Sequence, residues 1–308
     1  MNKYDLVIIG SGPAGVSAAI YASRQRLNLL VISKDEGGQV AKKAVDIENY
    51  PGFNKISGPD LAKVFQDQLK ANDVQVVLDE VLKIEKKDDG FVLSTKLGEK
   101  YESQAVIIAT GADPRPLEAE GEKEYIGKGV SYCALCDGPI FRNKDVVVIG
   151  GGNSGFETAM FLSNYVKKIY ILEFGSTVKA DQQNQDLIQK TGKAEIITNA
   201  KVIKIQGKTL VDSIVYQNTQ SKEEKKIDVE GVFVEIGYSP ATAFVKDLVN
   251  FSERDEIVTD LETYETRTPG LFAAGDCNVS KYKQIIAAAG EGAKAALAAY
   301  GYLQKIKK

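Results

Sequence analysis

Gly10-Ser-Gly-Pro-Ala-Gly15 directly follows the apolar run Leu6–Ile9, and Gly150-Gly-Gly-Asn-Ser-Gly155 directly follows a similar run, Val146–Ile149. Both segments fit the pattern G-x-G-x-x-G between a strand and a helix, which indicates a dinucleotide-binding turn. The first glycine permits the tight turn, the second lets the backbone approach a pyrophosphate, and the third lets the helix pack closely on the strand. A single match is weak, because any tight strand–helix turn can produce it. Two matches in the same context predict two dinucleotide-binding units.

The rest of the chain has the periodicity of an α/β protein. Pro59–Ala71 places its apolar residues on one helical face. A strand that runs into a Gly-x-x-Pro turn occurs at Val106–Pro114 and again at Val232–Pro240, so both units end in the same way. Further short β-branched runs suit parallel strands that are covered on both faces, at Leu29–Ile32, Ala105–Ala109, Ile169–Leu172 and Val232–Ile236. We therefore predict an α/β fold of two Rossmann-like three-layer domains.

Length and composition agree with this organisation and exclude several classes of function. The 308 residues correspond to two domains of roughly 150 residues each. With 39 basic and 42 acidic residues the net charge is -3, so no broad basic field for nucleic acid is expected. The absence of histidine excludes Ser-His-Asp and Cys-His hydrolases and every His-ligated metal site. Acid–base chemistry must therefore use a carboxylate, a thiol, a lysine or a tyrosine.

The N-terminal sequence and the apolar runs predict where the protein works. MNKYDLVIIG has neither the basic region nor the cleavage site of a signal peptide. No apolar run reaches the roughly 18 residues that span a bilayer. We therefore expect a cytoplasmic protein with no membrane partner.

Three cysteines, Cys133, Cys136 and Cys277, are too few for a secreted disulfide framework. The first two form Cys-x-x-Cys just before the second dinucleotide unit, and two thiols at this spacing can close a small reducible ring. A zinc half-site and two inert thiols are the alternatives. Zinc needs four ligands, and without histidine only Cys277 remains as a further soft donor. We prefer a redox disulfide and expect no metal site.

The sequence contains only one well-placed ribose contact. An acidic residue about 20 positions after the glycine loop usually holds a ribose hydroxyl. In the second unit Glu173 stands at the end of Ile169–Leu172, where such a residue is needed. In the first unit the strand ends at Ser33, and the acids Asp35 and Glu36 come later. The contact to the adenosine ribose in the first unit therefore stays unassigned.

Taken together, these motifs resemble the low-molecular-weight thioredoxin reductase family. The resemblance covers essentially the whole chain and rests on GSGPAG, Gly37-Gly38-Gln39, Asn49-Tyr-Pro-Gly52, Ala109-Thr-Gly111, CALCDG, GGGNSG, Ala274-Gly-Asp276 and Lys283-Gln284. Within that family, Leu172-Glu-Phe174 and Val178-Lys-Ala-Asp181 look closest to the flavoprotein reductase half of the F component of alkyl hydroperoxide reductase. That protein carries an additional N-terminal thioredoxin-like disulfide domain, and we expect this chain to lack it.

The resemblance implies an FAD-binding domain formed by residues 1–113 and 242–308, with an inserted NAD(P)-binding domain, residues 114–241, that carries the two cysteines. The helix that begins near Gln284 would direct its positive end at the flavin pyrimidine. Cys277 has no partner in the family pattern, and we interpret it as structural. The residues that match the family's FAD contacts are Gly10, Gly12, Pro13, Ala14, Gly15, Gly38, Gln39, Asn49, Thr110, Gly111, Gly275, Asp276, Lys283 and Gln284. Those that match its nicotinamide dinucleotide contacts are Gly150, Gly152, Asn153, Ser154, Gly155 and Glu173.

The segment after the second strand of the second unit predicts which nicotinamide cofactor is used. Relatives that use NADPH have basic residues there, arginines among them. This chain reads Glu173-Phe-Gly-Ser-Thr-Val-Lys-Ala-Asp181, with one lysine and no arginine. A carboxylate can bond the ribose 2′-hydroxyl but repels a phosphate. We therefore expect NADH to be preferred over NADPH, for which Lys179 is the nearby cationic candidate.

The activity implied by the resemblance is that of a pyridine nucleotide–disulfide oxidoreductase. Electrons would pass from NADH through FAD to the Cys133–Cys136 disulfide, and then to a separate thioredoxin-like or glutaredoxin-like protein that could serve a peroxiredoxin. By family correspondence, Cys136 receives electrons from the flavin and Cys133 attacks the partner's disulfide. Asp137 is the general acid/base, for which burial would have to raise its pKa. Family members are homodimers, and we expect the same here.

Other functions fit parts of the sequence. The donor could be ferredoxin or another non-nicotinamide carrier, or the chain could be a flavin NADH oxidase whose cysteines are idle. A protein that only senses dinucleotides or binds zinc is a third alternative. Since nicotinamide, disulfide and partner cannot all react in one arrangement, we expect the inserted domain to rotate on linkers near Ala112–Leu117 and Gly237–Ala243.

Overall fold

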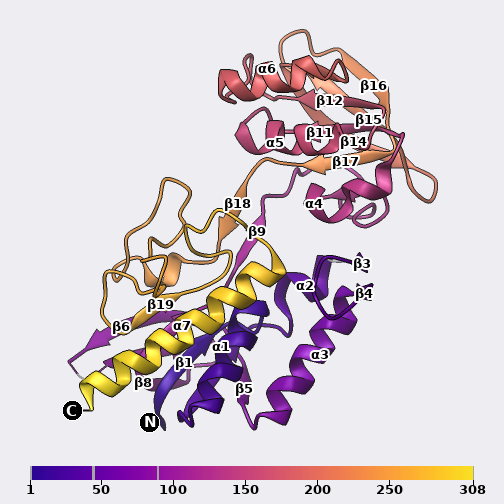
Figure 1. Cartoon of the computed structure of the whole chain (residues 1–308). Coiled ribbons are helices and arrows are strands. Elements are labelled where there is room, and N and C mark those ends of the chain that lie inside the picture. Colours follow the sequence, from indigo (N-terminus) through magenta and orange to yellow (C-terminus); the bar gives the residue numbers. More distant parts are fainter. Residues whose placement is uncertain (1, 44–45, 89, 308) are drawn as a thin grey trace. The chain divides into compact units, whose positions relative to one another are not determined.

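A computed structural model describes residues 2–43, 46–88 and 90–307, and the chain divides into two compact units (Figure 1). The first unit comprises residues 1–113 and 238–308. The inserted unit comprises residues 114–237. One unit is thus interrupted in sequence by the other.

The described part of the first unit is built on a seven-stranded mixed sheet of order β5-β2-β1-β8-β7-β6, with β19 also paired to β8. Its strands are β1 (Asn2–Ile9), β2 (Leu29–Ser33), β5 (Gln75–Leu78), β6 (Val81–Lys87), β7 (Gly90–Thr95), β8 (Lys100–Ile108) and β19 (Leu271–Ala273). The central strand β1 is parallel to both neighbours, so that Ile9 lies opposite Ile32 and Ile108. The hairpin β6–β7 is antiparallel to β8, whereas β19 is parallel to it. The carboxyl ends of β1, β2 and β8 therefore share one edge.

Helices cover one face of this sheet. They are α1 (Pro13–Arg24), α2 (Gly38–Lys43), α3 (Gly58–Ala71) and α7 (Ile285–Ile306). The 3-10 turn η2 (Ala243–Val245) packs on the opposite face, and β3 (Asp46–Ile47) and β4 (Ile56–Ser57) form a short antiparallel pair. α1 and α7 lie side by side (Figure 1), and a Cβ on Gly292 would lie 1.9 Å from the carbonyl oxygen of Ala14. Ser57 caps α3, its Oγ accepting the Asp60 N–H at 3.2 Å. α3 therefore begins within one residue of the predicted Pro59.

The inserted unit has a five-stranded parallel sheet of order β10-β17-β11-β12-β13 in its described residues. The strands are β10 (Val130–Ser131), β11 (Asp145–Ile149), β12 (Lys168–Leu172), β13 (Ala194–Ile197) and β17 (Gly231–Val234). One face packs on α4 (Ala134–Asp137), the 3-10 turn η1 (Gly138–Phe141), α5 (Asn153–Leu162) and α6 (Gln182–Lys190). The other face packs on an antiparallel sheet of β14 (Ala200–Gly207), β15 (Val211–Asn218) and β16 (Glu224–Asp228).

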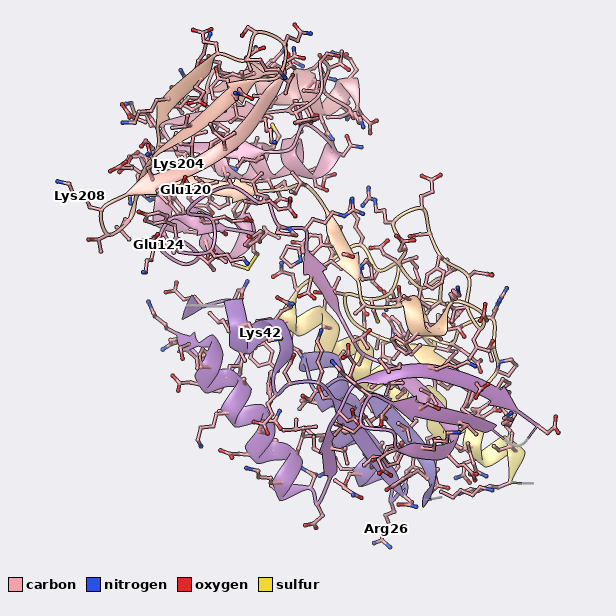
Figure 2. All side chains as sticks on the ribbon, turned by 180° about the vertical axis from the view of Figure 1, so that it is seen from behind. Arg26, Lys42, Glu120, Glu124, Lys204 and Lys208 are labelled. Atoms are coloured by element: carbon pink, nitrogen blue, oxygen red, sulfur yellow. A yellow bond between two sulfur atoms is a disulfide. The ribbon has the colours of Figure 1, made fainter. Side chains whose placement is uncertain are left out.

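The antiparallel sheet of the inserted unit is also joined to the start of that unit. Glu120 forms a bridge with Lys204, and their side chains form an ion pair of 2.8 Å (Figure 2). Both side chains are solvated, so this pair contributes about 1 kcal/mol or less.

The two connections between the units pair with each other as β9 (Ala112–Pro114) and β18 (Tyr238–Pro240) (Figure 1). They coincide with the repeated Gly-x-x-Pro segments. Gly111 (φ +68°) and Gly237 (φ +96°) precede them in the left-handed region, which a residue with a Cβ rarely enters. Equivalent turns of the internal repeat therefore carry the chain out of the first unit and back into it.

The predicted fold class is confirmed, and every predicted strand is present. β1 begins at Asn2, four positions before the predicted Leu6, because its backbone continues to pair with β8 beyond the apolar run. β17 ends at Val234, two positions before the predicted Ile236. None of the helices in the described part of the chain is both long and apolar enough to cross a membrane.

Candidate cofactor and redox sites

The two glycine loops have the same backbone packing. A Cβ on Gly15 would lie 1.9 Å from the Gly10 carbonyl oxygen, and a Cβ on Gly155 would lie 1.9 Å from that of Gly150. Gly10 and Gly150 themselves have φ values of +106° and +124°. A side chain at Gly15 or Gly155 would push the helix away from the strand end, and one at Gly10 or Gly150 would collide with the carbonyl of Ala109 or Glu235, 2.3 Å away. The predicted reasons for these glycines therefore apply in both units.

The space in front of each loop is open. A Cβ on Gly12 or Gly152 would meet no atom within 4 Å, and these two glycines are the N-caps of α1 and α5. In the first unit a Cβ on Gly38, which has φ +56°, would lie 3.7 Å from the Gly12 Cα, an ordinary contact distance. First-turn N–H groups and the positive end of a helix dipole at each opening suit a pyrophosphate.

The second residue of each loop is held by the neighbouring strand, but through different chemistry. The Ser11 N–H donates to Ser33 Oγ at 3.1 Å, and both side chains are buried. The Gly151 N–H donates to Glu173 Oε2 at 2.7 Å, while Glu173 Oε1 accepts the Gly175 N–H at 2.7 Å. Glu173 thus directly follows β12, as predicted, and its carboxylate bonds the loop, whereas the first unit has a neutral hydroxyl there.

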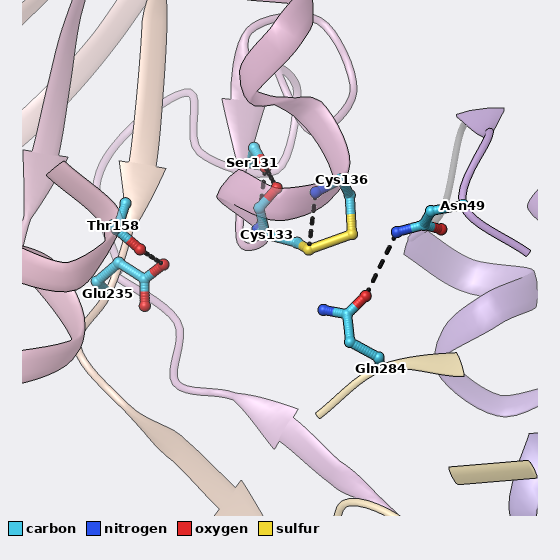
Figure 3. The surroundings of a disulfide bond; sticks show 7 residues. All are labelled: Asn49, Ser131, Cys133, Cys136, Thr158, Glu235 and Gln284. Atoms are coloured by element: carbon cyan, nitrogen blue, oxygen red, sulfur yellow. Dashed lines mark hydrogen bonds between the residues drawn. A yellow bond between two sulfur atoms is a disulfide. The ribbon is translucent and has the colours of Figure 1, made fainter. Parts of the chain in front are cut away.

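Two predicted FAD contacts, Gln39 and Asn49, lie in α2 and shortly after it, and a third, Gln284, is the N-cap of α7. Asn49 Nδ2 donates to Gln284 Oε1 at 3.4 Å (Figure 3). Gln39 Nε2 donates to Asp113, but Gln39 Oε1 is buried and accepts no hydrogen bond from the described residues. A buried acceptor of this kind normally has a partner, and a ligand donor would supply one.

Asp276, in the first unit, is partly buried near the charged side chains of Lys283 and Glu291. Burial raises its pKa to about 6, Lys283 opposes this and Glu291 adds to it. Lys283 pairs with Glu256 at 3.1 Å and donates to the Asn278 carbonyl at 2.5 Å, so its predicted cofactor contact has strong internal competitors.

Glu291 is a buried residue that the motifs did not indicate. It accepts the Gly275 N–H and Asn278 Nδ2, each at 2.8 Å, and so holds the segment on both sides of Asp276. An acid within the alanine-rich run of α7 was the sequence signal.

The predicted FAD contacts outside the turns described above also lie in the first unit. Thr110 Oγ1 donates to the Ala241 carbonyl at 3.0 Å, joining β8 to the returning chain. Pro13 begins α1, and Ala14 packs against Gly275, where a Cβ would lie 3.0 Å from the Ala14 Cβ. Cys277 is fully buried, which raises its pKa to about 11, in agreement with a structural role.

The redox motif has the geometry of a small ring at a helix start. Cys133 and Cys136 form a disulfide, and Cys133 is the N-cap of α4 (Figure 3). The Cys133 N–H donates to Ser131 Oγ at 3.0 Å, and the Cys136 N–H donates to Cys133 Sγ at 3.2 Å. Cys136 is exposed, while Cys133 and Asp137 are partly buried.

A buried acid anchors the residue just before the disulfide. Tyr132 Oη donates to Glu122 at 2.6 Å, and Glu122 also accepts the N–H groups of Leu117 and Glu118 at 2.8 and 2.9 Å. The redox turn is thereby joined to the start of the inserted unit. Sequence reasoning missed Glu122, because it is one of four acids between positions 118 and 124 and the sequence does not mark it as the buried one.

A second segment closes over the Gly150 loop. The N–H groups of Lys179 and Ala180 donate to the Gly151 carbonyl at 2.8 and 3.0 Å. Asn153 is a predicted dinucleotide contact. Its side chain exchanges hydrogen bonds with Asp181, and its backbone forms the first residue of α5. Ser154 and Lys179 are exposed.

Both units therefore fit the groups that the sequence predicts. The open cradle and the orphaned Gln39 oxygen suit FAD in the first unit, and the fixed Glu173 and open loop suit a nicotinamide dinucleotide in the inserted unit. In residues 2–43, 46–88 and 90–307, no group of three or more Cys, Asp or Glu side chains is arranged to hold a metal ion.

Comparisons with known proteins agree with this geometry. The family model described as pyridine nucleotide-disulphide oxidoreductase matches residues 4–292. NADH dehydrogenase of Bacillus subtilis (strain 168) and the F component of alkyl hydroperoxide reductase of Staphylococcus aureus (strain MSSA476) are each 41% identical over 303 residues. Each match covers 98% of this chain and 59% of the relative, so the chain spans about 59% of the length of these curated relatives. The thioredoxin reductase of Streptococcus pyogenes MGAS5005 superposes with a TM-score of 0.93 at 39% identity, covering 98% of this chain and 99% of that one.

Proposed function

The chain belongs to the pyridine nucleotide-disulphide oxidoreductase family, and we propose that it carries electrons from NADH, by way of FAD, to the Cys133–Cys136 disulfide and on to a disulfide of a thioredoxin-like or glutaredoxin-like protein. The observation that carries this proposal is the disulfide itself, which lies in the same unit as the Gly150 loop and its fixed Glu173. A dinucleotide loop and a reducible disulfide within one unit are the two ends of such a reaction.

We propose that the open side of Gly12 and Gly38, together with Gln39 and Asp276, holds FAD. When bound, FAD accepts hydride from the nicotinamide and supplies two electrons to the disulfide. The first-turn N–H groups of α1 would hold the pyrophosphate, and the start of α7 would offer its positive end to the flavin. Gln39 Oε1, which is buried without a partner among the described residues, would accept a hydrogen bond from the cofactor.

Once reduced, the disulfide gives two thiols whose roles differ. The Cys133 thiolate attacks a partner disulfide and forms a mixed disulfide, releasing one partner sulfur as a thiolate. Cys136 then attacks Cys133 Sγ, which restores the internal disulfide and releases the reduced partner. Two electrons leave the chain in this exchange, and Asp137 holds the proton that the leaving sulfur takes up. The Cys136 N–H, 3.2 Å from Cys133 Sγ, favours a thiolate at Cys133.

We propose that Glu173 makes NADH the preferred donor. Two backbone N–H groups fix its carboxylate at 2.7 Å each and leave further lone pairs for a ribose 2′-hydroxyl. A 2′-phosphate at the same place would meet a negative charge that cannot easily move aside.

We further propose that the inserted unit turns on its two connections, so that donor and partner reach the disulfide in alternation. Gly111 and Gly237 stand at the two crossings in left-handed conformations, and the two connections pair as β9 and β18. The protein acts as a homodimer, and its partner disulfide protein serves a peroxiredoxin.

Anaerobic stopped-flow absorbance of the FAD-loaded protein tests the donor. NADH should bleach the flavin rapidly, and NADPH should do so much more slowly. Fast bleaching by NADPH alone would contradict the role of Glu173, and no bleaching by either would favour ferredoxin or another donor.

Cysteine variants test the acceptor side with thioredoxin and glutaredoxin as probes. Cys136→Ser should trap a mixed disulfide with the partner through Cys133, whereas Cys133→Ser should trap none. A flavin oxidase with idle cysteines would give a different result. Cys133→Ser would oxidise NADH at the native rate, and the native protein would reduce neither thioredoxin nor glutaredoxin.

A further inference from the structure

Glu235 stands at a position between the two reactive parts of the inserted unit. It follows β17 directly, and its N–H donates to the Ile149 carbonyl at 2.8 Å, just before the Gly150 loop. On the other side of β17, Ser131 lies opposite Phe233 in the parallel pair β10–β17. Cys133 and Glu235 each come two residues later. Glu235 therefore lies at the carboxyl edge of the sheet, between the strand that leads to the dinucleotide loop and the strand that leads to the disulfide.

The carboxyl of Glu235 is partly buried and is hydrogen-bonded within its own unit. Thr158 Oγ1, on α5, donates to Glu235 Oε1 at 2.7 Å (Figure 3). Burial raises the pKa of Glu235 to about 7, the Thr158 bond opposes this and the charge of Glu157 adds to it. Burying a carboxyl at this position costs folding free energy, and an apolar side chain would avoid that cost.

The internal repeat shows what packing alone requires at this position. In the first unit the equivalent residue is Ala109, whose N–H donates to the Ile9 carbonyl at 2.8 Å. A Cβ on Gly10 would lie 2.3 Å from the Ala109 carbonyl oxygen, and a Cβ on Gly150 would lie 2.3 Å from that of Glu235. The backbone is thus the same, yet one unit has a methyl group and the other a carboxyl. The shared backbone arrangement therefore does not require a carboxyl at this position.

The strand order gives the direction in which that ligand extends. The order β17-β11-β12 places Glu173 after β12, the glycine loop after β11 and Glu235 after β17. If Glu173 holds the adenosine ribose and the loop holds the pyrophosphate, the second ribose must come to the β17 side. This step rests on the function proposed above.

We propose that Glu235 binds the nicotinamide-side ribose of the dinucleotide, its carboxylate accepting a hydrogen bond from a ribose hydroxyl while Thr158 fixes the carboxylate on α5. Glu173 and Glu235 thus each bind one of the two riboses, on either side of the Gly150 loop.

Comparing the binding of two nucleotide fragments isolates the contact between Glu235 and the second ribose. ADP has the adenosine half and the diphosphate, and ADP-ribose adds only the second ribose. Calorimetric titration of the FAD-loaded protein should show that Glu235→Ala, which copies Ala109, weakens ADP-ribose about tenfold and leaves ADP within about twofold, as loss of a charge-assisted bond requires. Glu235→Gln keeps an acceptor oxygen and the shape of the side chain, and it should lose about threefold for ADP-ribose alone.

Matched variants identify the source of the effect. Glu173→Gln should weaken ADP and ADP-ribose by the same factor, because both contain the adenosine ribose. Thr158→Val removes the bond that fixes Glu235 and should weaken ADP-ribose by a few-fold and ADP not at all.

An equal loss for both fragments in Glu235→Gln, or no loss for either, would overturn the inference. Failure of the proposed function gives a different result: native protein that binds ADP-ribose in this manner but passes no electrons to its disulfide would refute the function and leave the Glu235 contact standing. Native protein that binds neither fragment would refute both.

Discussion

The loops Gly10–Gly15 and Gly150–Gly155 have the same backbone contacts but are flanked by different side chains. Where Ser33 holds the Ser11 N–H in the first unit, Glu173 holds the Gly151 N–H in the inserted unit. On the opposite side, Ala109 in the first unit corresponds to Glu235 in the inserted unit.

This difference shows which part of a dinucleotide site is general and which is selective. The glycines make the turn, the close approach and the open space that any pyrophosphate needs. The residues at the ends of the neighbouring strands are where we propose the ribose contacts, and there one unit has Ser33 and Ala109 while the other has the carboxylates of Glu173 and Glu235. In the proposed function, a few side chains on one repeated backbone therefore distinguish the FAD site from the nicotinamide dinucleotide site.

The largest expected effect comes from breaking what the two loops share. Gly155→Ala would place a Cβ 1.9 Å from the Gly150 carbonyl, and relief of that overlap costs about 3 kcal/mol, or roughly 100-fold in affinity. We expect it to abolish measurable ADP binding while the flavin-to-protein absorbance ratio stays native. Gly15→Ala, with the same 1.9 Å overlap at Gly10, should do the reverse and deplete FAD. If Gly155→Ala lost its FAD as well, the two loops would not be independent sites.

The second prediction concerns the carboxyl that replaces Ala109. Burial raises the pKa of Glu235 from 4.5 to about 7, so the folded protein holds this proton more tightly than the unfolded chain does. The native protein therefore loses stability as pH rises through this window, and the loss is complete above about pH 7. Glu235→Gln does not ionise, and between pH 4.5 and 8 it should gain about 3 kcal/mol in unfolding free energy relative to the native protein.

Urea unfolding followed by circular dichroism at both pH values measures this gain. Glu230→Gln, an exposed position just before β17, is the control and should show no such change. A constant difference between native protein and Glu235→Gln at all pH values would contradict burial as the cause.

The third prediction makes the inserted loop resemble the first. Glu173→Ser replaces the carboxylate by the hydroxyl found at Ser33, and it should weaken NAD+ about tenfold through loss of a charge-assisted bond. The affinity for NADP+ should fall much less. The ratio of NAD+ affinity to NADP+ affinity, measured by calorimetry, should therefore also fall about tenfold. Lys179→Ala is the companion variant and should affect NADP+ alone. Parallel losses for both nucleotides in Glu173→Ser would show that Glu173 serves only to shape the loop.

Short-range patterns were sufficient to predict the loops, the strands after them and the disulfide motif. Each depends on residues within a few positions, such as the glycine spacing or the two cysteines around α4. Glu235 and Glu291 were missed because their partners are distant in sequence: Glu291, for example, accepts hydrogen bonds from the segment around Asp276. Both are acids within otherwise apolar runs, and that signal was present in the sequence. Glu122 was missed because it is one of four acids between positions 118 and 124, and nothing in the sequence marks which of them is buried.

Lys283 shows the opposite limit of sequence reasoning. The family motif assigns it to the cofactor, yet in the folded chain it pairs with Glu256, 27 positions away, and donates to a carbonyl. A motif predicts which residue is present but not which neighbour competes for its charge. Only the packing of the 256 and 278 segments supplies that competitor.

The smallest expected effect lies on the neutral side of the comparison. Ser33→Ala removes the hydroxyl that accepts the Ser11 N–H at 3.1 Å and that donates to the Asp35 carbonyl at 2.6 Å. Because both groups are buried, the loop should lose about 1 kcal/mol, which weakens FAD about fivefold in equilibrium dialysis of the apoprotein. Ser33→Thr keeps the hydroxyl and should bind FAD as the native protein does. The opposite outcome is a larger loss of FAD affinity in Ser33→Ala than of NAD+ affinity in Glu173→Ser. It would mean that the serine contact contributes more to nucleotide binding at a glycine loop than the carboxylate contact does.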